Sequence, residues 1–233
     1  MVTHVGSKII GTPTLGLRGL VLWLKFDEGS GTAANDSSLY NNHGVINGAT
    51  WTTGKFGSAL KFNGSGAYVN VADSPSLKIG ESSGTWVFWV CCLGDTGNEQ
   101  TILKHGTTTP SIRPYLDPGT MPSYGKMQLR IEYERGTADW GTEFLLELNK
   151  WYHVAITFDG SSLNVYLNGV RSDYAMATSS LGRHGGDITV SEATNSFWGY
   201  IDNVLIYNRA ISEDEIKLLY YNRIGAVLSK SVS

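Results

Sequence analysis

The sequence predicts an all-β fold, a two-sheet antiparallel sandwich with one short helix near the C-terminus. Short runs that alternate apolar and polar residues recur along the chain, separated by turns rich in glycine, asparagine, aspartate and serine. The 28 glycines are accompanied by only 6 prolines, which favours tight turns between strands over disorder. The one helical signal is the capping box Ser212–Glu215, which precedes an apolar run.

Composition and charge bound the domain count and exclude two classes of protein. With 233 residues and 41% hydrophobic content, the chain can bury a large core within one sandwich domain. We expect a lead-in segment over 1–16, a single domain over 17–223 and a tail over 224–233. The net charge of −3, without a run of like charges, gives no electrostatic footprint for nucleic acid. No apolar stretch reaches the length of a membrane span.

The cysteines and the first residues bear on where the protein works. Cys91 and Cys92 are adjacent in a predicted strand, so their side chains point to opposite faces and we expect both to be reduced. A disulfide framework and a four-cysteine zinc site are therefore excluded. Met1–Lys8 lacks the charged-then-apolar order of a secretory signal. We expect either an extracellular or cell-surface protein whose signal has been removed, or a cytoplasmic one.

The N-terminal half predicts strands and one polar loop. Gly19–Phe26 is the first strand, and Gly57–Phe62 with Ala67–Val71 forms a hairpin. The loop Asp36–Gly44 is dense in side-chain oxygens, which either make hydrogen-bonded turns or surround a hard cation. Thr85–Cys92 is apolar on both faces, so we expect it at the centre of a sheet.

The C-terminal half contains a long irregular stretch and the most regular hairpin. Residues 94–125 hold most of the irregular sequence, which in a compact domain is more often functional than idle. Strands are predicted at Lys126–Glu134, Phe144–Leu148, Asp187–Ser191 and Phe197–Tyr207. In Trp151–Gly169, pairing Phe158 with Leu163 gives the hairpin one apolar and one polar face. We expect the polar face, with His153, Asn164 and Tyr166, to form the floor of a binding surface.

Several motifs occur in a characteristic order. They are Leu22–Glu28, Asp36–Ser38 with Asn42–Gly44, Gly57–Gly64, Trp151–Ala155, Tyr166–Gly169, and Gly199–Val204 with Ile206–Ala210. The set resembles the laminin-G-like, concanavalin A-like lectin/glucanase group of jelly rolls over roughly residues 17–223. This resemblance implies a twisted double sheet with a concave face. It implies no single activity, because the fold hosts lectins, carbohydrate-binding modules, adhesion domains, glycoside hydrolases and polysaccharide lyases.

The resemblance also implies a structural calcium ion, which many members of the group bind. The matching positions are Asp27 at the end of the first strand, the loop from Asp36 to His43, and Asp202 in the last long strand. Calcium takes six to eight oxygen ligands, so His43 would contribute only its backbone carbonyl. The alternative is that these loops are ordinary hydrogen-bonded turns.

Glycoside hydrolases and polysaccharide lyases require different residues in the sequence. The Glu-x-Asp-x-x-Glu arrangement of laminarinase-type members is absent, which argues against a retaining glucanase. A polysaccharide lyase acting by β-elimination on a uronic acid needs a carboxylate-neutralising group, a base and an acid. Gln128 and Arg130 could bind the carboxylate, His153 could act as base and Tyr166 as acid, since we expect their strands in one sheet. The Arg-x-Glu-x-Arg and Gln-x-His strands of the alginate-lyase members are absent.

The favoured interpretation is a module that binds a polysaccharide, acidic polymers included, without cleaving it. Sugar sites combine aromatic rings with planar polar groups. We expect exposed rings at Tyr115, Tyr124 and Trp140 in or near irregular segments, and loop contacts from His105, Arg113 and His184. Further candidate ligand-binding residues lie on the predicted polar strand faces: Arg130, Glu132, Asn164 and Tyr166. A third interpretation is a structural adhesion domain with neighbouring domains in a larger surface or virion protein.

Overall fold

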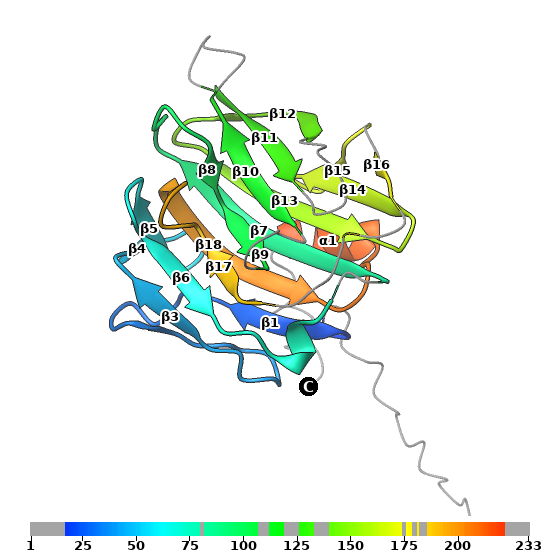
Figure 1. The fold of residues 1–233 in the computed structure, drawn as a ribbon, viewed down its shortest axis with the longest axis horizontal. Coiled ribbons are helices and arrows are strands. Elements are labelled where there is room, and N and C mark those ends of the chain that lie inside the picture. The colour runs from blue at the N-terminus through cyan, green and yellow to red at the C-terminus, as the bar shows by residue number, and fades with distance from the viewer. Residues whose placement is uncertain are drawn as a thin grey trace, which may run out of the picture.

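The computed structural model describes residues 17–79, 82–106, 112–118, 126–132, 140–173, 176–178, 181 and 186–221. Its strands form two layers, so the predicted all-β sandwich is confirmed (Figure 1). The back sheet is one nine-stranded antiparallel sheet in the order β15-β14-β13-β7-β18-β5-β4, with β1 also on β18 and β16 on β14. Its strands are β1 Leu20–Leu24, β4 Thr50–Thr53, β5 Ser58–Asn63, β7 Gly84–Cys92, β13 Trp151–Phe158, β14 Ser162–Leu167, β15 Val170–Arg171, β16 Met176–Ala177 and β18 Trp198–Tyr207.

The front layer combines two smaller sheets, β2-β3-β6-β17-β9 and β12-β11-β10-β8. Their strands are β2 Ala33–Ala34, β3 Gly44–Asn47, β6 Tyr68–Val71, β17 Ile188–Val190, β9 Leu103–His105, β12 Trp140–Glu147, β11 Lys126–Glu132, β10 Arg113–Asp117 and β8 Gln100–Thr101. The two sheets meet where β8 leads into β9. There the Ile102 amide donates to the Pro114 carbonyl, and His105 pairs with Ile112 in an isolated bridge.

The core lies between the layers because each strand turns its alternate apolar side chains inward. Trp86, Phe88 and Val90 of β7 are fully buried in it, opposite front-layer residues such as Val69 and Ile188. Every residue of β7 is buried, and β13 and β18 pair with it on either side. The prediction that Thr85–Cys92 is a central strand is therefore confirmed.

The hairpin of β13 and β14 has the register predicted from its alternation. Phe158 pairs with Leu163, Val154 with Leu167, and Thr157 with Asn164. The Asp159 carboxylate closes the turn by accepting from the Ser161 and Ser162 amides, at 2.9 and 2.8 Å. The apolar face of the hairpin enters the core, as expected.

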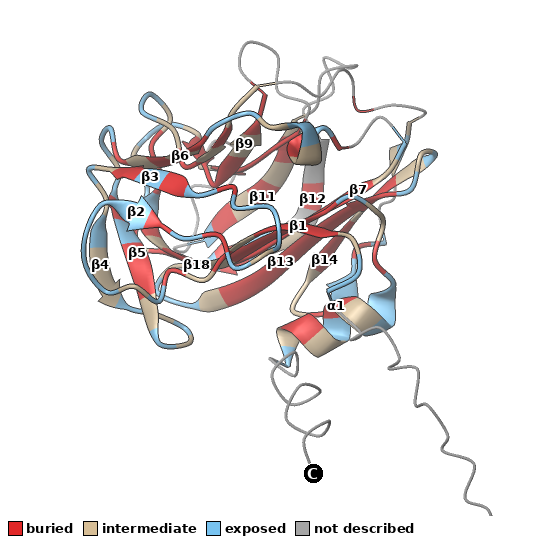
Figure 2. Cartoon of the chain, turned by 90° about the horizontal axis from the view of Figure 1, so that it is seen from below, coloured by how far each residue is buried: buried red, intermediate tan, exposed pale blue. Residues whose placement is uncertain are grey.

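One short helix, α1 (Glu213–Tyr220), covers the other face of this hairpin. Its capping box is present, since the Ser212 hydroxyl accepts from the Glu215 amide and the Glu215 carboxylate accepts from the Ser212 amide. Ile216 and Leu219 pack on the outer side of the back sheet (Figure 2), in a cluster with Leu20, Val87, Ala155, Tyr166, Leu205, Tyr207 and Ile211. The prediction that the polar face of the hairpin is the floor of an open surface is therefore wrong.

A bulge divides β18 between two partners. Trp198–Ile201 pairs with β5, whereas Val204–Tyr207 pairs with β1. Asn203, between these stretches, has a left-handed backbone with φ of 49°. The bulge places Asp202 and Leu205 both on the side of the back sheet away from the main core, where both are buried, while Ile201 and Val204 enter the core. Within the described part of the chain, no helix is long and apolar enough to cross a membrane.

Candidate functional site

The four residues predicted as a lyase constellation lie in different layers. Gln128 and Arg130 are on β11 in the front layer, whereas His153 and Tyr166 are on β13 and β14 in the back sheet. Our expectation that their strands share one sheet is wrong. Alternation along a strand fixes which side chains share a face of that strand, but not which strands pair.

His153 and Tyr166 are also sealed from solvent. His153 is 1% exposed and lies against Trp89 and Tyr220, with ring centroids 5.2 and 5.9 Å away. Burial lowers the pKa of His153 to about 3, so the ring is neutral at ordinary pH. Tyr166 is 6% exposed within the cluster under α1, and burial raises its pKa. Neither side chain can serve a ligand as base or acid in this arrangement. Asn164 is half-buried on the same face of the β13–β14 hairpin.

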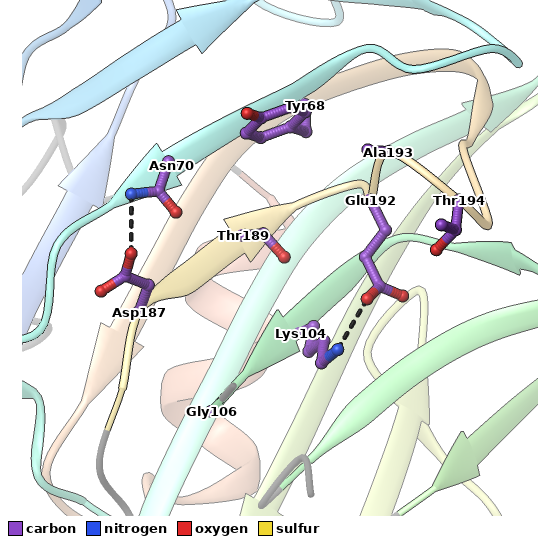
Figure 3. Close-up of a pocket in the computed structure, with 9 residues that line it drawn as sticks. All are labelled: Tyr68, Asn70, Lys104, Gly106, Asp187, Thr189, Glu192, Ala193 and Thr194. Atoms are coloured by element: carbon purple, nitrogen blue, oxygen red, sulfur yellow. Dashed lines mark hydrogen bonds and ion pairs between the residues drawn. The ribbon is translucent and has the colours of Figure 1, made fainter. Parts of the chain in front are cut away.

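A pocket of about 290 Å³ opens instead on the outer side of the front layer (Figure 3). Its lining is mostly polar: Tyr68, Asn70, Lys104, Gly106, Asp187, Thr189, Glu192, Ala193 and Thr194. Three neighbouring strands, β6, β17 and β9, supply its floor. On each strand the core residues alternate with the pocket residues, so that Val69 separates Tyr68 from Asn70 and Thr189 lies between Ile188 and Val190.

Hydrogen bonds and an ion pair hold the pocket side chains in place. The Lys104 ammonium contacts Glu192 Oε1 at 2.7 Å, and Glu192 Oε2 accepts from the Thr101 hydroxyl at 2.7 Å. Asn70 Nδ2 donates to Asp187 Oδ2 at 2.9 Å. Figure 3 shows the Tyr68 ring at the top of the view, the Asn70–Asp187 pair to its left and the Lys104–Glu192 pair below it. The polar groups are therefore oriented before any ligand arrives.

The same network continues onto strands β10 and β11. Arg113 Nη1 donates to Thr101 Oγ1 at 3.2 Å, Nη2 lies 2.8 Å from Glu99 Oε2, and Nε binds Glu132. Burial alone would lower the pKa of Arg113, but the hydrogen bonds and charges of the two glutamates outweigh it and raise the pKa. Arg130 pairs with Asp117 on the same face, at 3.1 Å. A charged strip thus borders the pocket.

Some of the predicted ligand-binding residues lie on this front face, whereas others are buried. Arg113, Glu132 and Arg130 are together on the front face, although Arg113 lies in a strand and not in a loop. His105 is not a loop residue either: it is fully buried on β9, facing the core and Trp86 at a ring distance of 6.3 Å. Tyr115 is 1% exposed, with the Arg113 guanidinium 4.4 Å above its ring, so the expectation of an exposed ring there is wrong.

Three further predictions fall where the structure describes no side chain. Tyr124 and His184 lie outside the described residues, and Trp140 begins β12 without a described side chain. Conversely, the sequence analysis missed the pocket residues Tyr68, Asn70, Lys104, Thr189 and Glu192. The alternation of Tyr68–Val71 could have identified Tyr68 and Asn70 as a polar face. The pairing of β6, β17 and β9, which are far apart in the sequence, carries no comparable local signal.

The four predicted calcium ligands form two separate groups of contacts. Both oxygens of Asp36 are used by its own loop and by the neighbouring strand β1, because they accept from the amides of Trp23, Ser38 and Asn42 and from the Ser38 hydroxyl. His43 Nδ1 accepts from the Asp36 amide at 3.0 Å. Among the described residues, no three His, Cys, Asp or Glu side chains gather as they would to hold a metal. The Asp36 loop therefore matches the hydrogen-bonded turn that we gave as the alternative.

Asp27 and Asp202 form the other group, around the tight turn 54–57. Asp202 is fully buried and accepts from the Phe56 amide at 3.0 Å and from Asn203 Nδ2 at 2.9 Å. A Cβ on Gly54 would lie 2.7 Å from Asp202 Oδ2, and a Cβ on Gly57 would collide with Asp27 Oδ1, so both positions require glycine. Burial raises the pKa of Asp202 to about 7, helped by the neighbouring charge of Asp27.

A protein-family model agrees with the fold. The model described as Concanavalin A-like lectin/glucanases superfamily matches residues 63–217. A search of curated protein sequences finds no match.

Solved structures that contain this fold include the binding domain of a mosquitocidal protein, one domain of an arabinanase and a sialidase. The binding domain of Paraclostridial Mosquitocidal Protein 1 matches with a TM-score of 0.68 and 20% identity, over 88% of this chain and 52% of that one. Domain 4 of AbnA, a GH43 extracellular arabinanase from Geobacillus stearothermophilus solved with arabinotriose, matches with a TM-score of 0.65 and 18% identity, over 86% and 98%. Trypanosoma rangeli sialidase matches with a TM-score of 0.66 and 19% identity, over 88% and 33%. The chain thus spans about half of the first structure and a third of the sialidase.

Proposed function

Because the chain belongs to the concanavalin A-like lectin/glucanase superfamily, we propose that it is a polysaccharide-binding module whose site is the pocket on the outer side of the front layer. The observation that carries this proposal is the set of groups in the pocket. One aromatic ring, Tyr68, lies beside the Lys104–Glu192 and Asn70–Asp187 pairs, whose ammonium, carboxylate and amide groups are already fixed by mutual contacts, and beside the Thr189 hydroxyl.

These groups suit a sugar ring chemically. A pyranose or furanose presents an apolar face of C–H groups and a rim of hydroxyls that both donate and accept. Tyr68 offers a flat surface to the first, and Asn70, Lys104 and Glu192 offer partners to the second. A pocket of about 290 Å³ accommodates one or two sugar residues of a chain that continues along the face.

The solved relatives support this choice at the level of the fold. A domain of an arabinanase has it in complex with arabinotriose, and toxin binding domains have it too. Since the chain spans only part of several of these structures, we propose that it works beside other domains, in an extracellular or cell-surface protein. An adhesion domain that binds protein is the competing function. The lyase alternative gains no support, because its four residues lie in two layers.

The test is binding to polysaccharides embedded in native gels, with isothermal calorimetry for any polymer that retards the protein. The wild-type protein is expected to be retarded, and Tyr68→Ala is expected to weaken binding about tenfold through loss of the ring contact. Tyr40→Ala is the matched control, since Tyr40 is 49% exposed in the 36–44 loop and does not line the pocket. Absence of binding to every polymer, or equal losses in both variants, would overturn the proposal.

We further propose that Asp27 and Asp202 hold the structural calcium ion implied by the family. The chemistry of the pair supports it: two neighbouring carboxylates, one fully buried, face a turn whose glycines leave room for no side chain. Calcium prefers such oxygen ligands, and the remaining positions would be filled by backbone carbonyls and water. The ion would neutralise two like charges and fix the 54–57 turn on β18. Asp36 and His43 are not part of this proposed site.

A further inference from the structure

The charges around the pocket indicate which polysaccharides it selects. Resting on the binding function proposed above, we infer that the site takes neutral polysaccharides and rejects polymers of uronic acids. The surface consists of the pocket and the adjoining strip, which is defined by Arg113 and Asp117 of β10, Arg130 and Glu132 of β11, Thr101 of β8, and Glu99 just before β8.

Each described cation on this surface already contacts a carboxylate. Lys104 lies 2.7 Å from Glu192, and both side chains are mostly buried. Arg113 is clamped between Glu99 and Glu132, and Arg130 contacts Asp117. To bind the carboxylate of a uronic acid, one of these cations would have to leave a partner that is held in the same network. The displaced carboxylate would then remain beside the new one.

Among the residues that the structure describes, negative charge is also in excess on this surface. Five carboxylates, Glu99, Asp117, Glu132, Asp187 and Glu192, face three cations. Asp187 is held by hydrogen bonds from Asn70 Nδ2 and the Asp73 amide, and forms no ion pair with any residue that the structure describes. A polyanion would approach a surface of its own sign, and juxtaposed like charges oppose binding in an interface.

The same groups favour hydroxyls. A carboxylate that accepts one hydrogen bond or ion pair has further lone pairs, and a sugar O–H can donate to them without disturbing the existing contact. Glu192 and Asp187 can each serve a neutral sugar in this way, on either side of Thr189 (Figure 3). Negative charge on this surface therefore strengthens the binding of neutral sugars and excludes anionic ones.

The experiment measures affinity by calorimetry at 150 mM salt for two groups of polymers. The neutral group is arabinan, galactomannan and fully methyl-esterified pectin, and the acidic group is alginate and polygalacturonate. Esterified pectin and polygalacturonate share one backbone and differ in charge. We expect the tightest neutral polymer to bind at least about tenfold more tightly than either acidic one, with little dependence on salt.

A charge variant tests the cause. Glu192→Gln releases the Lys104 ammonium and should improve binding of polygalacturonate about fivefold. Asp214→Asn, on the exposed side of α1 across the molecule, makes the same charge change and should leave it unaltered. Equal or tighter binding of acidic polymers by the wild type would overturn this inference and leave the binding function standing. Binding of no polymer would instead overturn the binding function itself.

Discussion

Two buried titratable residues, His153 and Asp202, lie in one row of the back sheet on either side of Trp89. Burial moves their pKa values in opposite directions, that of His153 down to about 3 and that of Asp202 up to about 7. In both cases the folded protein favours the neutral form. Their effects on stability consequently have opposite signs over an overlapping range of pH.

The sign of each residue's effect on stability depends on whether the folded or the unfolded state binds its proton more tightly. Folded Asp202 binds its proton more tightly than the unfolded chain does, so its contribution is complete below about pH 4 and is lost as the pH rises towards about 7. Folded His153 binds a proton less tightly, so its contribution is complete above about pH 6.5 and is lost as the pH falls towards about 3. A measurement on Asp202 therefore needs a background without His153.

We predict that Asp202→Asn flattens the pH dependence of stability in a His153→Phe background. Without calcium, the melting temperature of His153→Phe should fall between pH 4 and pH 7, whereas that of the double variant should change little there. Calcium should raise the melting temperature of His153→Phe at pH 7 by binding the ionised Asp202, and raise that of the double variant much less. Differential scanning calorimetry with calcium or with chelator measures both. Superimposable profiles for the two proteins would contradict the prediction that Asp202 ionises over this range of pH. Absence of a calcium effect in either protein would contradict the proposed metal site.

At the scale of elements, α1 decides which face of the back sheet can meet a ligand. Only eight residues long, it buries Ile216 and Leu219 and brings Tyr220 to within 5.8 Å of Trp89, ring to ring. Its first turn is fixed by the capping box and by Arg209, which binds both oxygens of Glu215. The helix thus converts the polar face of the hairpin into a second, smaller core.

We predict that Ile216→Ala lowers the free energy of unfolding by about 2–4 kcal/mol, because Ile216 is fully buried between the helix and the sheet. Equilibrium unfolding in urea, followed by tryptophan fluorescence, gives this value. Asp214→Asn, two positions earlier on the solvent side of the helix, should change it by less than about 0.5 kcal/mol. A loss below about 1 kcal/mol for Ile216→Ala would show that the helix contributes little to the fold.

Contacts between neighbours in the chain could be predicted from the sequence, whereas contacts between distant elements could not. Alternation was enough to place Phe158 opposite Leu163, and the capping box was enough to begin α1 after Ser212, because both depend on neighbours in the chain. Arg130 and His153 are 23 positions apart and belong to different layers, and no local pattern records that. The covering of His153 by Tyr220 depends on a contact between residues 67 positions apart. The pocket likewise depends on the pairing of β6 with β17 and of β17 with β9.

For the whole molecule, β7 is the strand on which both layers depend. It pairs with β13 from Gly84 to Cys91 and with β18 on the other side. Its alternate residues enter the main core, and Val87 on the opposite face joins the cluster under α1. Cys91 and Cys92 at its end face these two sides. They are 3% and 1% exposed, and burial raises the pKa of both thiols, that of Cys92 to about 11. Both thiols are therefore protonated and covered at neutral pH.

We predict that neither thiol reacts with Ellman's reagent in the native protein within minutes, and that both react at once in 6 M guanidinium chloride. Because a thiol must be exposed and ionised to react, the native rate reports the opening that uncovers it. In Cys92→Ser only Cys91 remains, and in Cys91→Ser only Cys92. If β7 leaves the sandwich only when the whole domain unfolds, the ratio of the two variants' reaction rates should be no larger than the difference in their free energies of unfolding predicts. Much faster reaction of Cys91 would show that the outer side of the back sheet opens alone, and would place the molecule's weakest boundary between this sheet and its covering segments.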